Sequence, residues 1–278
     1  MVDQFGYLPD AQKIAVIRDP QTGYDQLFSY TPGTNLTLVN MNTNQVVLTA
    51  APVSWNAGAT DASSGDKAWW FDFSSITTPG TYAVVDATNN ARSPSFKIDV
   101  NVYKPVLKAA MRSFFYQRAG FAKQAPFADT GWTDAASHVG AGQDTQARIY
   151  NDKNNAATAK DVSGGWYDAG DYNKYTAWTA SYVVTLLQAY LEHPAAWTDD
   201  FNVPESGNGV PDILDEAKWG LSWLKKMQDA TGNNSVLCIV GVSHASPPSA
   251  ATGPSYYGPA TTDATMATAG AFALAAKV

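Results

Sequence analysis

Cysteine is almost absent from this chain of 278 residues, in which Cys238 is the only one. A single thiol excludes an intramolecular disulfide, so cysteine usage does not indicate the redox compartment. Long hydrophobic runs are also missing. None approaches the roughly 18 residues of a membrane span, and we expect no membrane partner. The 18 Lys and Arg residues are scattered and outnumbered by 25 Asp and Glu residues, which argues against a nucleic-acid partner.

Apolar and aromatic residues, in contrast, are plentiful. They make up 45% and 12% of the chain, enough for a substantial core in more than one domain. Most of the nine Trp and fourteen Tyr residues are expected in that core, but flat rings also stack on neutral sugars. The net charge of -7 disfavours an anionic polymer as substrate and is compatible with a neutral one.

Residues 1–100 have the pattern of an all-β sandwich. Short alternating runs are separated by Gly, Pro, Asn and Thr, and in residues 69–73 and 95–100 the period is close to two, so that one face packs inward. Strands are expected at Lys13 to Ile17, Gln26 to Tyr30, Asn35 to Asn40, Gln45 to Thr49, Ala68 to Phe73, Gly80 to Asp86 and Ser95 to Val100.

The period changes near residue 101, where we place the start of an all-α domain, residues 101–278. A first helix runs from about Pro105 toward Gly120, and a second from about residue 172 to Glu192. A third begins at Pro211, with acidic residues in its first turns where the helix dipole favours anions, and a fourth begins near Thr262. The long loops between them, 121–165 and 229–261, are of a length that is usually functional.

Two carboxylates stand three residues apart in GGWYDAGDYNKY, residues 164–175. Asp168 and Asp171 are flanked by small residues and bracketed by aromatics, so they could face a common point and hold and deprotonate one water. For a bare Asp-x-x-Asp a structural interpretation is the more common one, in which Asp171 caps the following helix and Asp168 stabilises a turn. The two roles are compatible, because a capping carboxylate is held rigidly.

This stretch resembles the signature of glycoside hydrolase family 9, the inverting endoglucanases, in the subgroup with an N-terminal immunoglobulin-like domain. Three further segments agree with it in the right order: DQFGYLP at 3–9, SFFYQR at 113–118 and SGNGVPDILDEAKW at 206–219. The resemblance implies an (α/α)6-barrel catalytic domain that is only partly present here. It also implies that Asp171 is the general base and that Asp168 helps it to hold the nucleophilic water.

The general acid of the family is a Glu in a downstream motif that this chain does not reach. Glu205 and Glu216 are better explained by local structural roles, so no acid is assigned. The chain as given is therefore expected to be inactive alone. An inverting mechanism needs the acid and the base on opposite faces of the sugar, ~6.5–9.5 Å apart, to admit a water.

No cofactor is required for this chemistry, and two structural metals are considered. The subgroup's zinc site is matched by Ala119, Ser137, His138 and Tyr167, of which only His138 is a ligand type, so zinc is predicted to be absent. Oxygen ligands for calcium could come from Glu205, Asn208, Asp212, Asp215 and Glu216. Capping and dipole effects at a helix start are the alternative explanation for these residues.

Aromatic residues near the motif and in the loops are candidates for stacking on sugar: Trp166, Tyr167, Tyr172, Trp132, Tyr256 and Tyr257. Together these features predict a secreted endo-β-1,4-glucanase, a cellulase that acts on cellulose or mixed-linkage β-glucan polysaccharide or oligosaccharide. No leader is visible at Met1, so export implies that one has been removed. The alternatives are an exo-acting β-glucosidase or glucosaminidase of the same family, and a non-catalytic glycan-binding or scaffold derivative.

Overall fold

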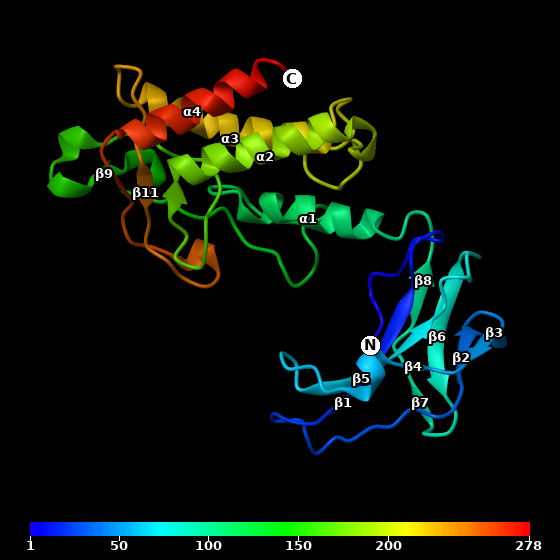
Figure 1. Cartoon of the computed structure of the whole chain (residues 1–278). Helices are drawn as coiled ribbons and strands as arrows, with labels where there is room; N and C mark the ends of the chain where they lie inside the picture. Colours follow the sequence, from blue (N-terminus) through cyan, green and yellow to red (C-terminus); the bar gives the residue numbers. More distant parts are fainter. The chain divides into compact units, whose positions relative to one another are not determined.

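The computed structural model describes all 278 residues and divides them into two compact units, Met1–Leu107 and Lys108–Val278. Figure 1 labels the elements along the chain. Each has its own hydrophobic core, so each fulfils the basic condition for an independent domain. None of the helices combines the length and apolar character required to cross a membrane.

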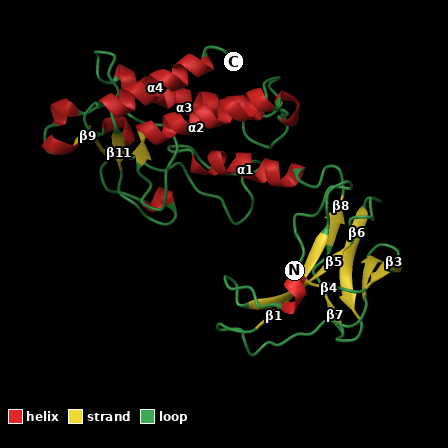
Figure 2. Ribbon diagram, viewed as in Figure 1, coloured by secondary structure: helices red, strands yellow, loops and turns green.

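The first unit consists of two antiparallel sheets, drawn in yellow in Figure 2. One sheet has the order β1-β5-β4, and the other has the order β3-β2-β6-β7, with β8 also paired to β6. The strands are β1 (Ile14–Pro20), β2 (Leu36–Asn40), β3 (Gln45–Ala50), β4 (Val53–Ser54), β5 (Asp66–Asp72), β6 (Gly80–Asp86), β7 (Ala91–Arg92) and β8 (Phe96–Ile98).

The core of this unit is drawn from both sheets. Leu36 and Leu38 of β2 and Phe71 of β5 are fully buried, as the alternating pattern of these strands predicts. The Tyr7 ring packs edge-on against Phe73 and Phe96, with ring centroids 5.2 and 5.3 Å away. An aromatic pair of this kind contributes about 1 kcal/mol beyond its buried area. The unit is therefore a β-sandwich closed by aromatic packing.

The strand predicted at Gln26 to Tyr30 is wrong. This segment is a turn in which the Phe28 N–H donates to the Asp25 carbonyl at 2.9 Å, and the Asp25 carboxylate pairs with Arg18 at 2.8 Å. Leu27 and Phe28 are 88% and 75% exposed, so these apolar side chains do not belong to the buried face of a strand. The two-residue strands β4 and β7 were not predicted, because such short strands carry no periodicity.

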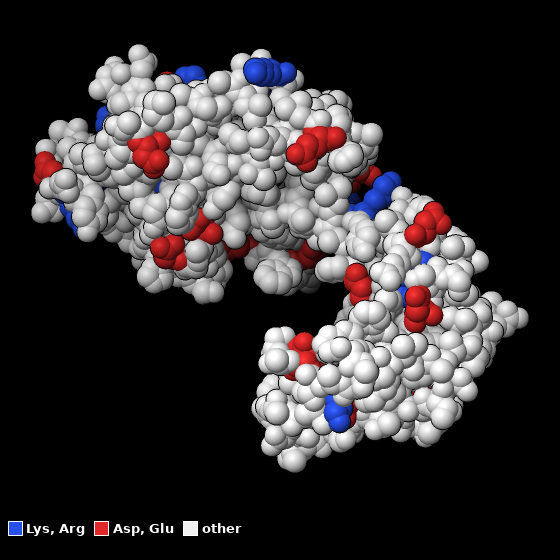
Figure 3. Space-filling model, viewed as in Figure 1, with Lys and Arg blue, Asp and Glu red and all other residues white.

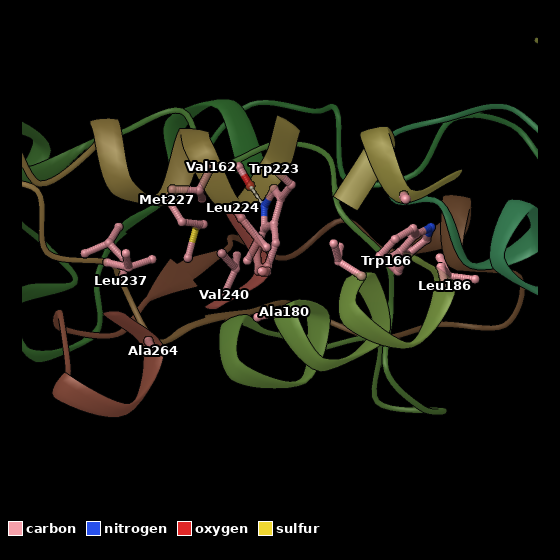
Figure 4. Packing of buried hydrophobic residues seen from close by; sticks show 14 of the residues in the cluster. Val162, Trp166, Ala180, Leu186, Trp223, Leu224, Met227, Leu237, Val240 and Ala264 are labelled. Carbon is pink, nitrogen blue, oxygen red and sulfur yellow. Dashed lines mark hydrogen bonds between the residues drawn. The ribbon is translucent and has the colours of Figure 1, made fainter. Parts of the chain in front are cut away.

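The second unit contains α1 (Lys104–Gln117, which begins before the division), α2 (Thr176–Glu192), α3 (Asp212–Asp229) and α4 (Thr262–Ala275). Helix α2 packs against both α3 and α4. Figure 4 shows the core between them, where Trp223 donates from Nε1 to the Val162 carbonyl at 3.0 Å. Gly220 of α3 allows close packing, because a Cβ there would lie 2.4 Å from the Trp166 ring.

The two long loops meet in a small sheet of order β10-β11-β12-β9. The strands are β9 (Arg148–Ile149), β10 (Lys174–Tyr175), β11 (Ile239–Gly241) and β12 (Tyr256–Tyr257). Strand β10 pairs with β11 just after Asp171, and Tyr172 has a positive φ of 56°. Because of this turn and strand, α2 begins at Thr176 and not near residue 172. The sheet ties the Asp168–Asp171 segment to loops distant in sequence.

Candidate active site

Asp168 lies in the turn that leads from the buried Trp166 to β10. Its carboxylate is half-buried, and Oδ1 accepts a hydrogen bond from the Tyr182 hydroxyl of α2 at 2.9 Å. Burial and the neighbouring carboxylate raise the pKa of Tyr182, so this phenol remains a donor at neutral pH. A pocket of about 160 Å³, lined also by Ser113 and Phe114, opens beside Asp168. The carboxylate is thus oriented toward a small solvent-accessible space.

Asp171 is exposed at the tip of the same turn. Its Oδ2 accepts from Asn173 Nδ2 at 2.8 Å, and its Oδ1 accepts from the Asn173 N–H at 3.3 Å. The residue that precedes α2 is Tyr175, and no side chain caps the helix there. The alternative in which Asp171 is a helix cap is therefore excluded.

The two aspartates differ from Asp144 and Glu216, two buried acidic residues of this unit, in having no cationic partner. Neither Asp168 nor Asp171 forms an ion pair, whereas the buried Asp144 and Glu216 each do. Tyr182 and Asn173 orient the two carboxylates without neutralising them. Two anionic carboxylates in one short turn, open to solvent, can accept both protons of a water and remove one of them.

Lys174, at the end of the turn, fixes it to the protein interior. Its side chain is fully buried, and Nζ lies 2.6 Å from Asp144 Oδ2 and 2.9 Å from the Gly164 carbonyl. Burial lowers the pKa of Lys174, and the Asp144 carboxylate opposes that effect. Asp144 also accepts from the Ser255 hydroxyl at 2.6 Å. The pair therefore joins the turn to both long loops.

Arg118 forms ion pairs with two of the five predicted calcium ligands. Its guanidinium is fully buried, lies 2.9 Å from Glu205 Oε1 and 2.7 Å from Glu216 Oε1, and sits over the Trp219 ring at 4.7 Å. Trp166 Nε1 donates to the second oxygen of Glu216 at 3.2 Å. These bonds confirm local structural roles for Glu205 and Glu216.

The remaining predicted calcium ligands lie at the start of α3. Asp215 accepts from Asn208 at 3.0 Å, and Asp212 accepts from Ser206 at 2.9 Å. Asp212 Oδ1 is buried without a hydrogen-bond partner, and burial raises the pKa of this carboxyl. No group of three or more His, Cys, Asp or Glu is arranged to hold a metal ion. Calcium at Glu205, Asn208, Asp212, Asp215 and Glu216 therefore stays a prediction.

The residues that match the zinc positions form a hydrogen-bonded cluster. The Tyr167 hydroxyl lies 2.5 Å from both Ser137 Oγ and His138 Nδ1, and His138 Nε2 lies 2.8 Å from the Ser243 carbonyl. Burial raises the pKa of Tyr167. Tyr167 directly precedes Asp168 in the chain, so these hydrogen bonds link the first long loop to the turn that carries Asp168.

Three of the predicted sugar-stacking residues are core residues. Trp166, Tyr167 and Tyr257 are only 2%, 3% and 3% exposed, and the Tyr257 hydroxyl donates to the Thr158 carbonyl at 2.7 Å. Their ring faces are covered by protein, so the prediction that they stack on sugar is wrong. Sequence could not reveal this, because ring burial depends on the segments that the fold brings over them.

The other three predicted aromatics reach the surface. Trp132 is 72% exposed, whereas Tyr172 and Tyr256 are partly exposed. Tyr256 lines a cleft of about 700 Å³ together with Tyr150 and Asn173. Asn173, which donates to Asp171, therefore connects this cleft to one of the two carboxylates. Figure 3 shows that Lys, Arg, Asp and Glu are dispersed over a largely uncharged face of the molecule.

Two family models match the chain. That of the cellulase N-terminal ig-like domain matches residues 1–90, and that of glycosyl hydrolase family 9 matches residues 103–278. The chain belongs to glycosyl hydrolase family 9. The predicted family and the immunoglobulin-like domain before the family 9 region are thereby confirmed.

Relatives of this family 9 chain include a cellulose 1,4-beta-cellobiosidase of Acetivibrio thermocellus, 33% identical over 250 residues, and a xyloglucan-specific endo-beta-1,4-glucanase of Bacteroides ovatus, 30% identical over 235. The alignments each cover 82% of this chain, but 26% and 36% of the relatives. A metagenome-derived family 9 endoglucanase has a solved structure with a TM-score of 0.80 and 35% identity, matching 99% of this chain and 49% of its own. The chain therefore spans about a quarter to a third of these curated relatives.

Several residues that build the site of this family 9 chain were not predicted from sequence. Tyr182 lies in α2 and Asn173 lies within the stretch GGWYDAGDYNKY, yet neither has a type or spacing that marks a partner for a carboxylate. Arg118 is part of a segment that resembles the family, but its sequence position marks no partner. The partner of Arg118 is remote in sequence, because Glu216 lies 98 residues further along the chain.

Proposed function

We propose that the chain carries the general base, but not the general acid, of an inverting glycoside hydrolase site that cleaves β-1,4-glucosidic bonds. Asp171 is the general base, and Asp168 helps it to hold the nucleophilic water. The observation that supports this most strongly is the contrast in charge pairing. The two turn aspartates are bound only by neutral donors, whereas Asp144 and Glu216 are paired with Lys174 and Arg118.

The reaction follows from this arrangement. A water held by the two carboxylates attacks the anomeric carbon while Asp171 takes its proton, and an acid on the opposite face protonates the leaving oxygen. Glu216 cannot be that acid, because it is fully buried and bound to Arg118. Glu205 is held by the same guanidinium. We therefore assign the acid to no residue of this chain.

The substrate we propose is a neutral β-glucan chain, cellulose or a related glucan, met outside the cell. The cleft lined by Tyr150, Tyr256 and Asn173 offers ring surface and an amide next to the carboxylates, as a sugar site requires. Relatives named for cellobiosidase and xyloglucanase activity support a β-1,4-glucan. The preference for cellulose or a related glucan and the endo mode of cleavage are parts of the same proposal.

The proposed scaffold is an (α/α)6 barrel to which this chain contributes its first helices. Helix α4 supports this, because it is apolar yet buries only Ala264, Thr268 and Ala271. Its residue Met266 is 67% exposed. An apolar helix with so little of its surface covered is suited to contact further helices.

The test uses the whole protein. Asp171→Ala should lower kcat at least ~10²-fold with KM nearly unchanged, because the activated water is lost. Asp168→Ala should also slow turnover. Asp152→Ala is the matched control, since Asp152 is likewise an exposed carboxylate that accepts from an Asn side chain, at 2.8 Å.

Product stereochemistry gives a second, independent test. Early time points followed by proton NMR should show the α-anomer first, as inversion of a β-glucosidic bond requires. Initial formation of the β-anomer would exclude the proposed mechanism. Near-normal turnover by Asp171→Asn without an added nucleophile would exclude Asp171 as the base.

A further inference from the structure

Asn173 is bound to both aspartates of the turn. Its backbone carbonyl accepts from the Asp168 N–H at 3.0 Å, and its side-chain Nδ2 donates to Asp171 Oδ2 at 2.8 Å. Its own N–H reaches the other oxygen of that carboxylate at 3.3 Å. No other residue contacts both Asp168 and Asp171 by hydrogen bonds, so Asn173 is the junction of the proposed water-binding pair.

A third contact fixes the orientation of the Asn173 amide. The Val242 N–H, just beyond β11, donates to Asn173 Oδ1 at 3.1 Å. An N–H can donate only to the oxygen of an amide, so the nitrogen of the same amide must point to Asp171. The carboxylate is thereby tied through one side chain to a strand end of the other long loop. Rotation of either group would break a hydrogen bond.

We propose that Asn173 is a positioning residue for catalysis: it holds the Asp171 carboxylate in the orientation that receives the proton of the attacking water. This inference rests on the proposed function. A bond to an ionised acceptor is about twice as strong as one between neutral groups, so loss of the amide should release the carboxylate to rotate. Base catalysis requires the accepting oxygen within hydrogen-bond reach of the proton.

The fold depends little on the same side chain, because its truncation leaves only the partly exposed Val242 N–H without an acceptor. The turn keeps the backbone bond from Asp168 to residue 173, and the buried Lys174 next to it stays paired with Asp144. Asn173 itself is only partly buried and lines the open cleft. Truncating its side chain should therefore change the reaction and leave folding nearly intact, which allows the two roles to be separated.

Asn173→Ala in the whole protein should lower kcat about 10-fold or more, with KM changed less than about 2-fold and the melting temperature nearly unchanged. Asn155→Ala is the matched control. Asn155 also donates from Nδ2 to a carboxylate, Asp152, at 2.8 Å, and its Oδ1 also accepts from a backbone N–H. It should leave kcat unchanged.

Asn173→Asp adds a signature that a merely structural role would not produce. At neutral pH the introduced carboxylate cannot donate to Asp171 and repels it, so activity should be low. When protonated, it can accept from Val242 with one oxygen and donate to Asp171 with the other. Repulsion between the two carboxylates raises the proton affinity of the pair above that of an ordinary Asp, whose pKa is about 3.9, so activity relative to the unchanged protein should recover as the pH falls from about 7 to about 5.

Two results would overturn the inference. One is a kcat of Asn173→Ala within about 2-fold of the unchanged protein while Asp171→Ala is inactive. The other is a loss of kcat accompanied by a large loss of melting temperature, with no recovery of Asn173→Asp at low pH. If Asp171→Ala itself keeps full activity, the proposed function fails, and the inference fails with it.

Discussion

Removal of the buried ammonium of Lys174 should destabilise the second unit strongly. Lys174→Met keeps a similar length of apolar chain but leaves Asp144, 1% exposed, without its partner at 2.6 Å. The Val162 and Gly164 carbonyls each lose a donor as well. The uncompensated carboxylate is the larger effect, because a buried charge cannot recover its hydration.

The expected magnitude follows from measured pairs of this kind. Breaking a buried ion pair from one side costs about 3–5 kcal/mol. For a domain of 150–250 residues, 1 kcal/mol corresponds to roughly 2–4 °C, so the melting temperature should fall by roughly 6–20 °C. Lys174→Met with Asp144→Leu should lose less than Lys174→Met alone, since neither charge is then left buried.

Thermal unfolding followed by tryptophan fluorescence measures this directly, since Trp223 lies in the same core. Lys226→Met is the control. Lys226 pairs with Asp161 at 3.2 Å, with the two side chains 36% and 54% exposed, so its loss should cost under about 1 kcal/mol. If Lys174→Met proved as mild as this control, or the double variant worse than the single, the argument from buried charge would be refuted.

Three further predictions concern other parts of the chain. Burial raises the pKa of Asp86, but hydrogen bonds from Gly33, Tyr30 and Asn89 outweigh this effect and lower the pKa from 3.8 to about 2. The ionised Asp86 carboxylate therefore stabilises the folded state above pH 4, and this stabilisation is lost as the pH falls toward 2. Asp86→Asn should therefore cost about 2 kcal/mol at pH 7 and flatten the acid limb of a stability curve; an unchanged limb would contradict this. Calcium should raise the melting temperature, and Asp212→Asn should abolish the rise; the absence of any rise would refute the predicted site, and a rise that persists in the variant would place the ion elsewhere. The chain as given should release no reducing sugar from carboxymethylcellulose and should self-associate through α4; hydrolysis that Asp171→Ala removes would show that it contains an acid.

Much of the fold could be predicted because its strands and helices follow from the local periodicity of apolar residues. The strand Gly80–Asp86 and the start of α4 at Thr262 follow the predicted bounds, and the third helix begins one residue after Pro211. The failures come from segments whose environment is set at a distance. Leu27 and Phe28 have the composition of a strand, yet an ion pair and a turn hold them at the surface. Lys174 joins a strand because β11 lies beside it.

The site divides in the same way. The spacing of Asp168 and Asp171 and the small residues around them are properties of the sequence. Together with the resemblance to the family, they predicted a water-binding pair. Whether a given ring is exposed is not such a property. Trp166 and Tyr167 stand beside the carboxylates in the chain, yet Trp166 packs on α3 and Tyr167 bonds to Ser137 and His138, so neither can stack on sugar.

The sequence by itself determined the family, the β-then-α organisation and the two aspartates, because these depend on residue type, order and short-range spacing. Only the tertiary structure decided which charges are neutralised and which remain available. Arg118 meets Glu216 and Lys174 meets Asp144 across long stretches of chain, whereas Asp168 and Asp171 receive only Tyr182 and Asn173. The physical reason is desolvation: a carboxylate enclosed by the fold needs a cation or hydrogen-bond donors to replace its hydration, and Asp144 and Glu216 have cations, whereas Asp171 at an open turn keeps contact with water.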